Sequence, residues 1–226
     1  NAIIPPPDGL AWRNSIQHAG PSLTLKDVVQ DLWTRGIPVV SLDILPVPNF
    51  QGLVGIVDGR PVILLGHKHD EPGRVAFVVS HEAGHLAAGD CAPNQPVVDE
   101  EEDVQDDSPI ERRADQYATQ VLVGRDTIPS INGTTFKDLA RQAANVQRQT
   151  GANASTLIFA WARRLGTSES YQKATLAVRA LYQDNGARKQ LRELFDHYVD
   201  ITAATETDRA LLRCVYGEPE RHEAAV

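Results

Sequence analysis

The chain carries a His-Glu-x-x-His pattern in which His81, Glu82 and His85 stand within one stretch of five residues. Side chains four positions apart lie on one face of an α-helix, about 40° from each other, so His81 and His85 can both reach one metal ion. Glu82 lies about 100° around the helix from His81, which suits a general base acting on water better than a ligand. This pattern is typical of zinc peptidases.

The residues around the motif predict the helix that it needs. An apolar run at 75–79 precedes the histidines; Asp70 and Glu71 are expected to cap the helix, Pro72 fits its first position, and Gly89 is placed to end it. The plainer alternative is a core helix whose histidines are satisfied by backbone groups. An acid beside two buried histidines is costly unless it is paired, so we expect a metal site.

A catalytic zinc ion takes three protein ligands and leaves its fourth position to water. Read as a helix, residues 109–122 place one stripe of side chains together, namely Glu111, Ala114, Asp115, Ala118 and Leu122. Glu111 is the expected third ligand, and Asp115 is expected to accept a hydrogen bond from the outer nitrogen of a ligand histidine. Tyr117 lies about 240° around the helix from Glu111, so we expect its side chain to point away from the metal. The alternative is an ordinary amphipathic helix whose acids pair with its two neighbouring arginines.

Together these two segments resemble the ImmA/IrrE family of metallopeptidases, which includes proteases of mobile elements and of the bacterial radiation response. The resemblance rests on residues 77–85, Phe-Val-Val-Ser-His-Glu-Ala-Gly-His, and on the later Glu-x-x-Ala-Asp pattern that starts at Glu111. It covers roughly residues 23–166, loosely outside the two helices. It implies that His81, His85 and Glu111 bind the metal and that Glu82 is the general base. The long acidic linker before Glu111 departs from the family's pattern.

The expected fold class is α+β, a zincin-like metallopeptidase domain with a small antiparallel or mixed sheet and a helical C-terminal region. The resemblance implies a zinc-dependent endopeptidase that cleaves a protein, a DNA-binding helix-turn-helix repressor, and so derepresses genes of a stress response or a mobile element. Zn²⁺ is the expected ion and Mn²⁺ the alternative. A metal-binding transcriptional regulator and a toxin–antitoxin component are the rival functions. Glu82 argues against a regulator, because a structural metal site needs no general base.

A short sheet is expected to lead into the motif helix. Thr24 can cap a preceding helix that Gly36 ends. Three strands follow in the sequence pattern, at 37–42, 52–57 and 61–65, the last two forming a hairpin around Asp58-Gly59-Arg60. An exposed strand beside the metal can bind a substrate by adding the substrate's backbone to the sheet.

The chain of 226 residues is long enough to bury a substantial core. We expect four regions: an extended N-terminal arm at 1–22, a zincin-like metallopeptidase domain at 23–132, a helix-turn-helix-like helical pair at 133–168 and a C-terminal helical region at 169–226. The first residue is Asn, which suggests that an upstream domain precedes the chain.

The helical pair comprises a helix beginning at Phe136 and another at 155–165, joined by a glycine-containing turn. Five basic residues and one acidic residue give residues 135–166 a charge of +4, against −8 for the whole chain, so the remainder carries −12. Arg163 and Arg164 lie at the far end of the second helix, whereas base-reading residues lie near its start. DNA binding is therefore not favoured, and we expect the pair to pack on the peptidase.

Composition and net charge argue against several other classes of protein. No apolar run approaches the ~20 residues of a membrane span and no signal peptide is recognisable, so we expect a cytoplasmic protein without a membrane partner. The net charge of −8 argues against general nucleic-acid binding. Cys91 and Cys214, the two cysteines, suggest no disulfide framework.

Seven acids crowd into residues 99–107, between the two predicted ligand helices. Such blocks repel themselves and are usually solvated, so a mobile loop is the first expectation. A second cation site and a lid that selects basic substrate segments are the alternatives. His67 and His69 lie in the connection before the motif helix and are expected at the surface rather than on the metal.

Overall fold

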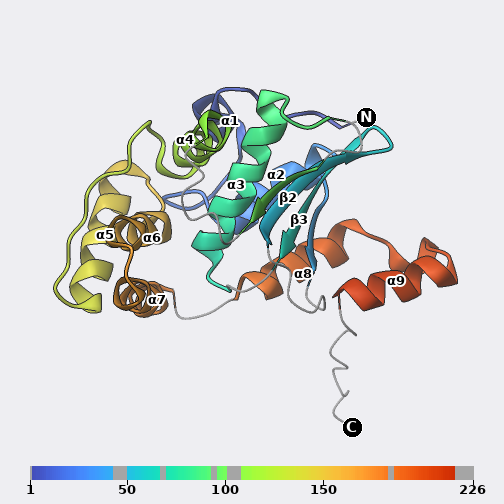
Figure 1. Ribbon diagram of the computed structural model, residues 1–226. Helices are drawn as coiled ribbons and strands as arrows, with labels where there is room; N and C mark the ends of the chain where they lie inside the picture. The colour runs from blue at the N-terminus through green and yellow to red at the C-terminus, as the bar shows by residue number, and fades with distance from the viewer. Residues whose placement is uncertain are drawn as a thin grey trace, which may run out of the picture.

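The computed structural model describes residues 2–42, 50–66, 70–92, 96–100, 108–182 and 186–216 (Figure 1). In chain order its elements are α1 Gly9–Ser15, α2 Leu25–Thr34, β1 Val39–Leu42, β2 Phe50–Val57, β3 Arg60–Gly66, α3 Pro72–Ala88, β4 Val97–Glu100, α4 Pro109–Val123, α5 Phe136–Thr150, α6 Ala154–Leu165, α7 Ser168–Leu181, α8 Ala187–Tyr198, a short 3₁₀ helix Ile201–Ala203, and α9 Glu206–Tyr216. The predicted α+β class is confirmed. Helix α3 runs through the middle of the molecule, with the sheet on one side and α5 to α7 on the other (Figure 1).

The described strands form one mixed sheet in the order β1-β3-β2-β4. β1 pairs with β3 in parallel, whereas β2 pairs with both β3 and β4 in antiparallel fashion. Alternate side chains of β1, β2 and β3 enter the core, because neighbouring residues on a strand point to opposite faces; Val39, Val54 and Ile63 are fully buried. The sheet therefore presents one apolar face to the helices.

The predicted hairpin is confirmed, and its turn follows from two residues. Asp58 and Gly59 both have positive φ, at 50° and 75°. Two consecutive residues of this kind form a type I′ turn, whose twist matches that of the flanking strands. The predicted helix at 24–36 is also confirmed: Thr24 and Asp27 form a capping box at the start of α2.

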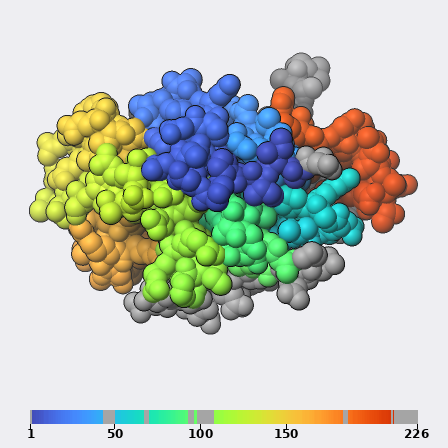
Figure 2. Space-filling view, turned by 90° about the horizontal axis from the view of Figure 1, so that it is seen from above, coloured from blue at the N-terminus to red at the C-terminus, as the bar shows by residue number. Residues whose placement is uncertain are grey.

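The expected extended arm at 1–22 is wrong, because it contains helix α1. Trp12 and Ile16 lie one turn apart, so both face inward, and Trp12 is 0% exposed. The Trp12 ring stacks on Tyr117 at 5.8 Å between centroids, and its Nε1 donates to Asp31 Oδ2 at 2.7 Å. Figure 2 shows the N-terminal segment lying across one face of the molecule, between the α4 segment and the hairpin. This segment is part of the core.

Buried apolar side chains form two clusters. The first contains side chains from helices α1, α2, α3, α4 and α8 and from the sheet. The second contains side chains from α5, α6 and α7 and from the end of α4. The two helices predicted from 136 and at 155–165 are confirmed as α5 and α6, and α7 packs with them. Helix α8 instead contacts α2 and β1, so the C-terminal helical region expected at 169–226 divides between the two clusters.

The acidic block does not begin as a loop, because its first two residues belong to β4. The backbone of β4 pairs with β2 at Val97↔Val54, Val98↔Leu53 and Asp99↔Gly52. The β-branched valines that precede the acids favour an extended strand. Residues 101–107, together with His67 and His69, lie outside the described residues.

Within the described residues, no helix is long and apolar enough to pass through a lipid bilayer.

Candidate metal centre

Helix α3 carries the motif and begins and ends close to where the sequence predicts. Pro72 occupies its first turn, and Gly89, with φ of 76°, ends it in the left-handed conformation. The expected capping by Asp70 is wrong, and Glu71 is the N-cap residue without a side-chain cap. Asp70 Oδ1 instead accepts from Arg188 N at 2.9 Å, at the start of α8. Asp70 therefore ties α8 to the entrance of α3.

Helix α4 approaches α3 closely because small residues meet at the crossing. An added Cβ on Gly84 would lie 3.2 Å from Ala114 Cα and 3.1 Å from Tyr117 Cβ. Ala114 and Ala118 are buried, as the predicted stripe of alanines requires. At the start of α4, Ser108 Oγ accepts from Glu111 N at 3.2 Å, which holds Glu111 in the first turn.

Three side chains from these two helices converge. His81 Nε2 lies 2.9 Å from Glu111 Oε2 and 3.1 Å from His85 Nε2, and His85 Nε2 lies 3.5 Å from Glu111 Oε1. His85 is 0% exposed and His81 5% exposed, whereas Glu111 is partly exposed. The structure thus brings together the three residues that the sequence predicts as ligands.

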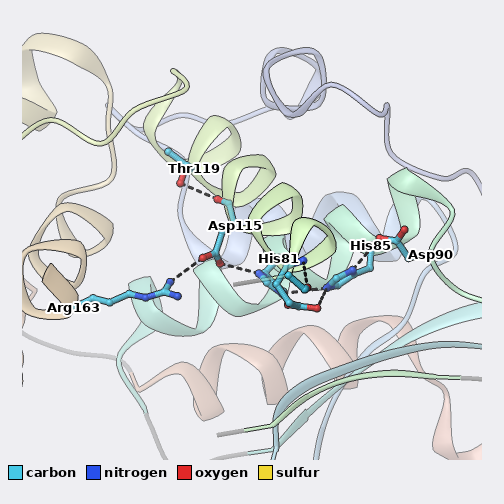
Figure 3. A network of polar contacts seen from close by, with 8 residues as sticks. His81, His85, Asp90, Asp115, Thr119 and Arg163 are labelled. Carbon is cyan, nitrogen blue, oxygen red and sulfur yellow. Dashed lines mark hydrogen bonds and ion pairs between the residues drawn. The ribbon is translucent and has the colours of Figure 1, made fainter. Parts of the chain in front are cut away.

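The outer nitrogen of each histidine faces a carboxylate (Figure 3). His81 Nδ1 lies 3.0 Å from Asp115 Oδ1, and His85 Nδ1 lies 3.0 Å from Asp90 Oδ2. Because a carboxylate only accepts, each Nδ1 carries the hydrogen, and Nε2 is the ring nitrogen that faces the other histidine and Glu111. Asp115 occupies the place that its spacing from Glu111 predicts.

An arginine holds each of these carboxylates in turn. Arg163 Nη1, from α6, lies 3.0 Å from Asp115 Oδ2, and Arg113 Nη2, from α4, lies 2.5 Å from Asp90 Oδ1. Each carboxylate therefore uses one oxygen for a histidine and the other for an arginine. The alternative in which the acids of this helix pair with Arg112 and Arg113 does not describe Arg113, because Arg113 pairs with Asp90, outside α4.

The electrostatics of the cluster favour a cation at its centre. Burial lowers the pKa of His81, but hydrogen bonds with Asp115 and Glu111, together with the charge of Glu82, outweigh burial and raise that pKa to about 10. The hydrogen bond with His81 outweighs burial at Glu111 and holds the pKa of Glu111 below its ordinary value. The acids thus retain a positive charge at His81, the charge that a metal ion would bring.

Glu82 lies beside the three converging residues and faces the sheet. Its side chain is 0% exposed, and an added Cβ on Gly52 of β2 would lie 2.2 Å from Glu82 Oε1. Gly52 therefore leaves the space that the carboxylate fills. The charge of Glu82 acts on both His81 and Cys91, which places it near the cluster; burial first, then the charges of Glu82 and Asp90, raises the pKa of Cys91 to about 11.

Three residues of this environment were missed by sequence reasoning, namely Asp90, Arg163 and Gly52. Asp90 carried a usable signal, because it directly follows the glycine that ends α3, and Asp90 N donates to His85 O at 3.0 Å. Arg163 carried no such signal, because α6 is distant in sequence from α3 and α4. Tyr117 points away, as expected: its hydroxyl donates to Pro6 O at 2.8 Å.

The residues fit a zinc ion by chemistry and by spacing. Two imidazole nitrogens and one carboxylate are the ligands of many catalytic zinc sites. Two nitrogens bound at about 2.05 Å to a tetrahedral ion stand about 3.3 Å apart, and the two Nε2 atoms here are 3.1 Å apart. One ligand atom from each of His81, His85 and Glu111 lies within 4.8 Å of the others.

No protein-family model matches the chain, and neither does any curated protein.

Proposed function

We propose that the protein is a zinc-dependent endopeptidase in which His81, His85 and Glu111 hold the metal and Glu82 is the general base. The observation that carries this proposal is the convergence of two imidazole nitrogens and a carboxylate from two helices. A positive charge at this meeting point offsets the negative charge of Glu111, and a metal ion bound there would supply it. A buried carboxylate beside them, Glu82, is the group that a structural metal site does not need.

When bound, the zinc ion supplies a Lewis acid that polarises the substrate carbonyl and lowers the pKa of a coordinated water toward ~7. Glu82 accepts a proton from the attacking water as the new carbon–oxygen bond forms. It then donates that proton to the amine nitrogen as the carbon–nitrogen bond breaks. The buried position of Glu82 strengthens its interaction with both proton partners, because water is excluded around it.

The substrate in this proposal is a protein segment in extended conformation, and the resemblance to ImmA/IrrE peptidases suggests a helix-turn-helix repressor. Gly52, which contacts Glu82, pairs with Asp99 of β4. β4 ends the sheet as described, with β2 on one side and no strand among the described residues on the other. A peptide that pairs with β4 would run alongside the metal centre.

The helical pair offers little to DNA, which supports the peptidase over the regulator. Ser155 and Thr156, at the start of α6 where a recognition helix would read bases, are buried against the rest of the protein. Arg163 binds Asp115, and Arg164 donates to Ser130 Oγ at 2.6 Å. Both arginines thus serve contacts within the chain.

The decisive experiment compares wild type with Glu82→Gln, each loaded with zinc and incubated with casein and with the helix-turn-helix regulator encoded nearest to the gene. Wild type should cleave, and Glu82→Gln should retain zinc while losing hydrolysis by at least about 100-fold, since a general base contributes about 10²- to 10⁴-fold. Equal cleavage by both proteins, or none by zinc-loaded wild type, would reject the proposal.

A further inference from the structure

We infer that Arg163 is a positioning residue of the metal centre, through which the unit formed by α5, α6 and α7 controls the affinity for zinc. The inference rests on the proposed zinc site. Arg163 does not contact a ligand histidine: it holds Asp115, and Asp115 holds His81 (Figure 3).

Each carboxylate oxygen of Asp115 accepts a hydrogen bond. Oδ1 lies 3.0 Å from His81 Nδ1, and Oδ2 lies 3.0 Å from Arg163 Nη1. A carboxylate fixed at both oxygens cannot turn about its own axis, so the imidazole that it contacts is held in one orientation. Removing Arg163 frees one oxygen and allows Asp115 to rotate away from His81.

Helix α6 is held firmly where this contact requires it. An added Cβ on Gly73, at the start of α3, would lie 1.9 Å from Ser155 Cβ, so the starts of the two helices touch. Asn153 caps α6 by accepting from Thr156 N at 3.1 Å, and its Nδ2 donates to Leu23 O at 2.8 Å in the first core. The base of α6 is thus anchored on the part of the chain that carries the metal ligands.

From that anchor α6 extends to Arg163. Arg163 follows Ser155 by eight residues, a rise of about 12 Å along the helix. Arg74 of α3 lies over the Phe159 ring of α6 at 5.7 Å, which is a second contact between the two helices. The anchored helix therefore presents Arg163 to Asp115 of α4.

The two histidines differ in what supports them. The support of His85 comes from residues adjoining α3 and α4, since Asp90 follows α3 and Arg113 lies in α4. The support of His81 depends on α6, which otherwise packs in the second apolar cluster. A displacement of α6 would therefore loosen His81 and leave His85 in place.

The expected size of the effect follows from exposure. The Arg163 side chain is 58% exposed and Asp115 34% exposed, so solvent weakens the pair. Loss of a group that contacts a ligand histidine typically reduces metal affinity about 10- to 100-fold. Arg163 acts one contact farther out, and we expect Arg163→Ala to weaken zinc binding about 3- to 10-fold.

The test measures zinc affinity by competition with a chromophoric chelator for wild type, Arg163→Ala, Arg163→Lys and Arg164→Ala. Arg164 is the matched control, because it is the next residue of α6, is charged alike and binds Ser130 and Asn132 rather than Asp115. Arg163→Ala should bind zinc more weakly, Arg163→Lys should recover part of the loss, and Arg164→Ala should match wild type.

A double-variant comparison separates positioning from a general loss of stability. If Arg163 acts through Asp115, Arg163→Ala should weaken zinc binding no further in an Asp115→Ala background. Additive losses, or an Arg163→Ala affinity equal to that of Arg164→Ala, would overturn the inference. Wild type that binds no zinc would instead reject the proposed zinc site itself, so the two failures are distinguishable.

Discussion

At the scale of single residues, a carboxylate bound to the outer nitrogen of a ligand histidine does two things. It fixes which nitrogen carries the hydrogen, and it makes the inner nitrogen a stronger donor to a metal. Asp115 and Asp90 stand in this position toward His81 and His85. Helical spacing predicts Asp115, because Asp115 and Glu111 share a helix face. Helical spacing does not place Asp90, because the chain leaves the helix at Gly89; the signal for Asp90 was its position directly after that glycine.

We predict that Asp90→Asn weakens zinc binding about 10- to 100-fold, because an amide binds the His85 ring and Arg113 less strongly than a carboxylate does. Chelator competition measures the affinity. Asp126→Asn is a suitable control, since Asp126 is an exposed residue beyond the other end of α4 that accepts from Gln120. Unchanged affinity in Asp90→Asn would show that this residue serves only the end of α3.

At the scale of elements, the site depends on close packing between α3 and two neighbours. On one side Gly84 lets α4 approach, and on the other Gly52 lets β2 approach the Glu82 carboxylate. The alanine stripe predicts the first approach. The second was not predictable, because the register between β2 and α3 depends on contacts between segments far apart in the sequence.

We predict that Gly52→Ala lowers the rate of hydrolysis by at least about 10-fold while zinc content stays unchanged. The new methyl group would lie 2.2 Å from Glu82 Oε1 and 2.8 Å from Val78 Cγ1, so it would push the proposed general base aside, whereas none of its three nearest atoms belongs to a proposed ligand. Steady-state kinetics and elemental analysis measure the two quantities.

Gly55→Ala is the matched control on the same strand. An added Cβ there would meet only Pro96, at 3.4 Å, which is an ordinary contact. If both variants hydrolyse substrate at the wild-type rate, Glu82 is not held by Gly52 as we describe.

In the molecule as a whole, segments distant in the sequence support helices α3 and α4, which carry the candidate metal ligands. Helix α1 stacks on α4 through Trp12 and Tyr117, and α8 is tied to the start of α3 through Asp70. Helix and strand patterns predict most individual elements correctly, including α2, the hairpin, α3, α4, α5 and α6. They do not predict these long-range contacts. The proline-rich start of the chain led to the prediction of an extended arm where α1 lies.

We predict that Trp12→Ala lowers the free energy of unfolding by about 3–5 kcal/mol, the usual cost of removing a fully buried large aromatic side chain. Urea unfolding measures the change. Ile3→Ala in the same segment should stay within about 0.5 kcal/mol of wild type, because Ile3 is 63% exposed. Equal, small effects in both variants would mean that α1 does not belong to the folded core.

We propose that helices α3 and α4 assemble one catalytic zinc site, and the zinc content of purified variants measures whether they do. Elemental analysis should find about one zinc ion per chain in wild type and in Glu82→Gln. His81→Ala, His85→Ala and Glu111→Ala should each lose most of it, because two remaining ligands hold zinc weakly. Zinc bound equally well by Glu111→Ala and wild type, or wild type that takes up none, would contradict the claim.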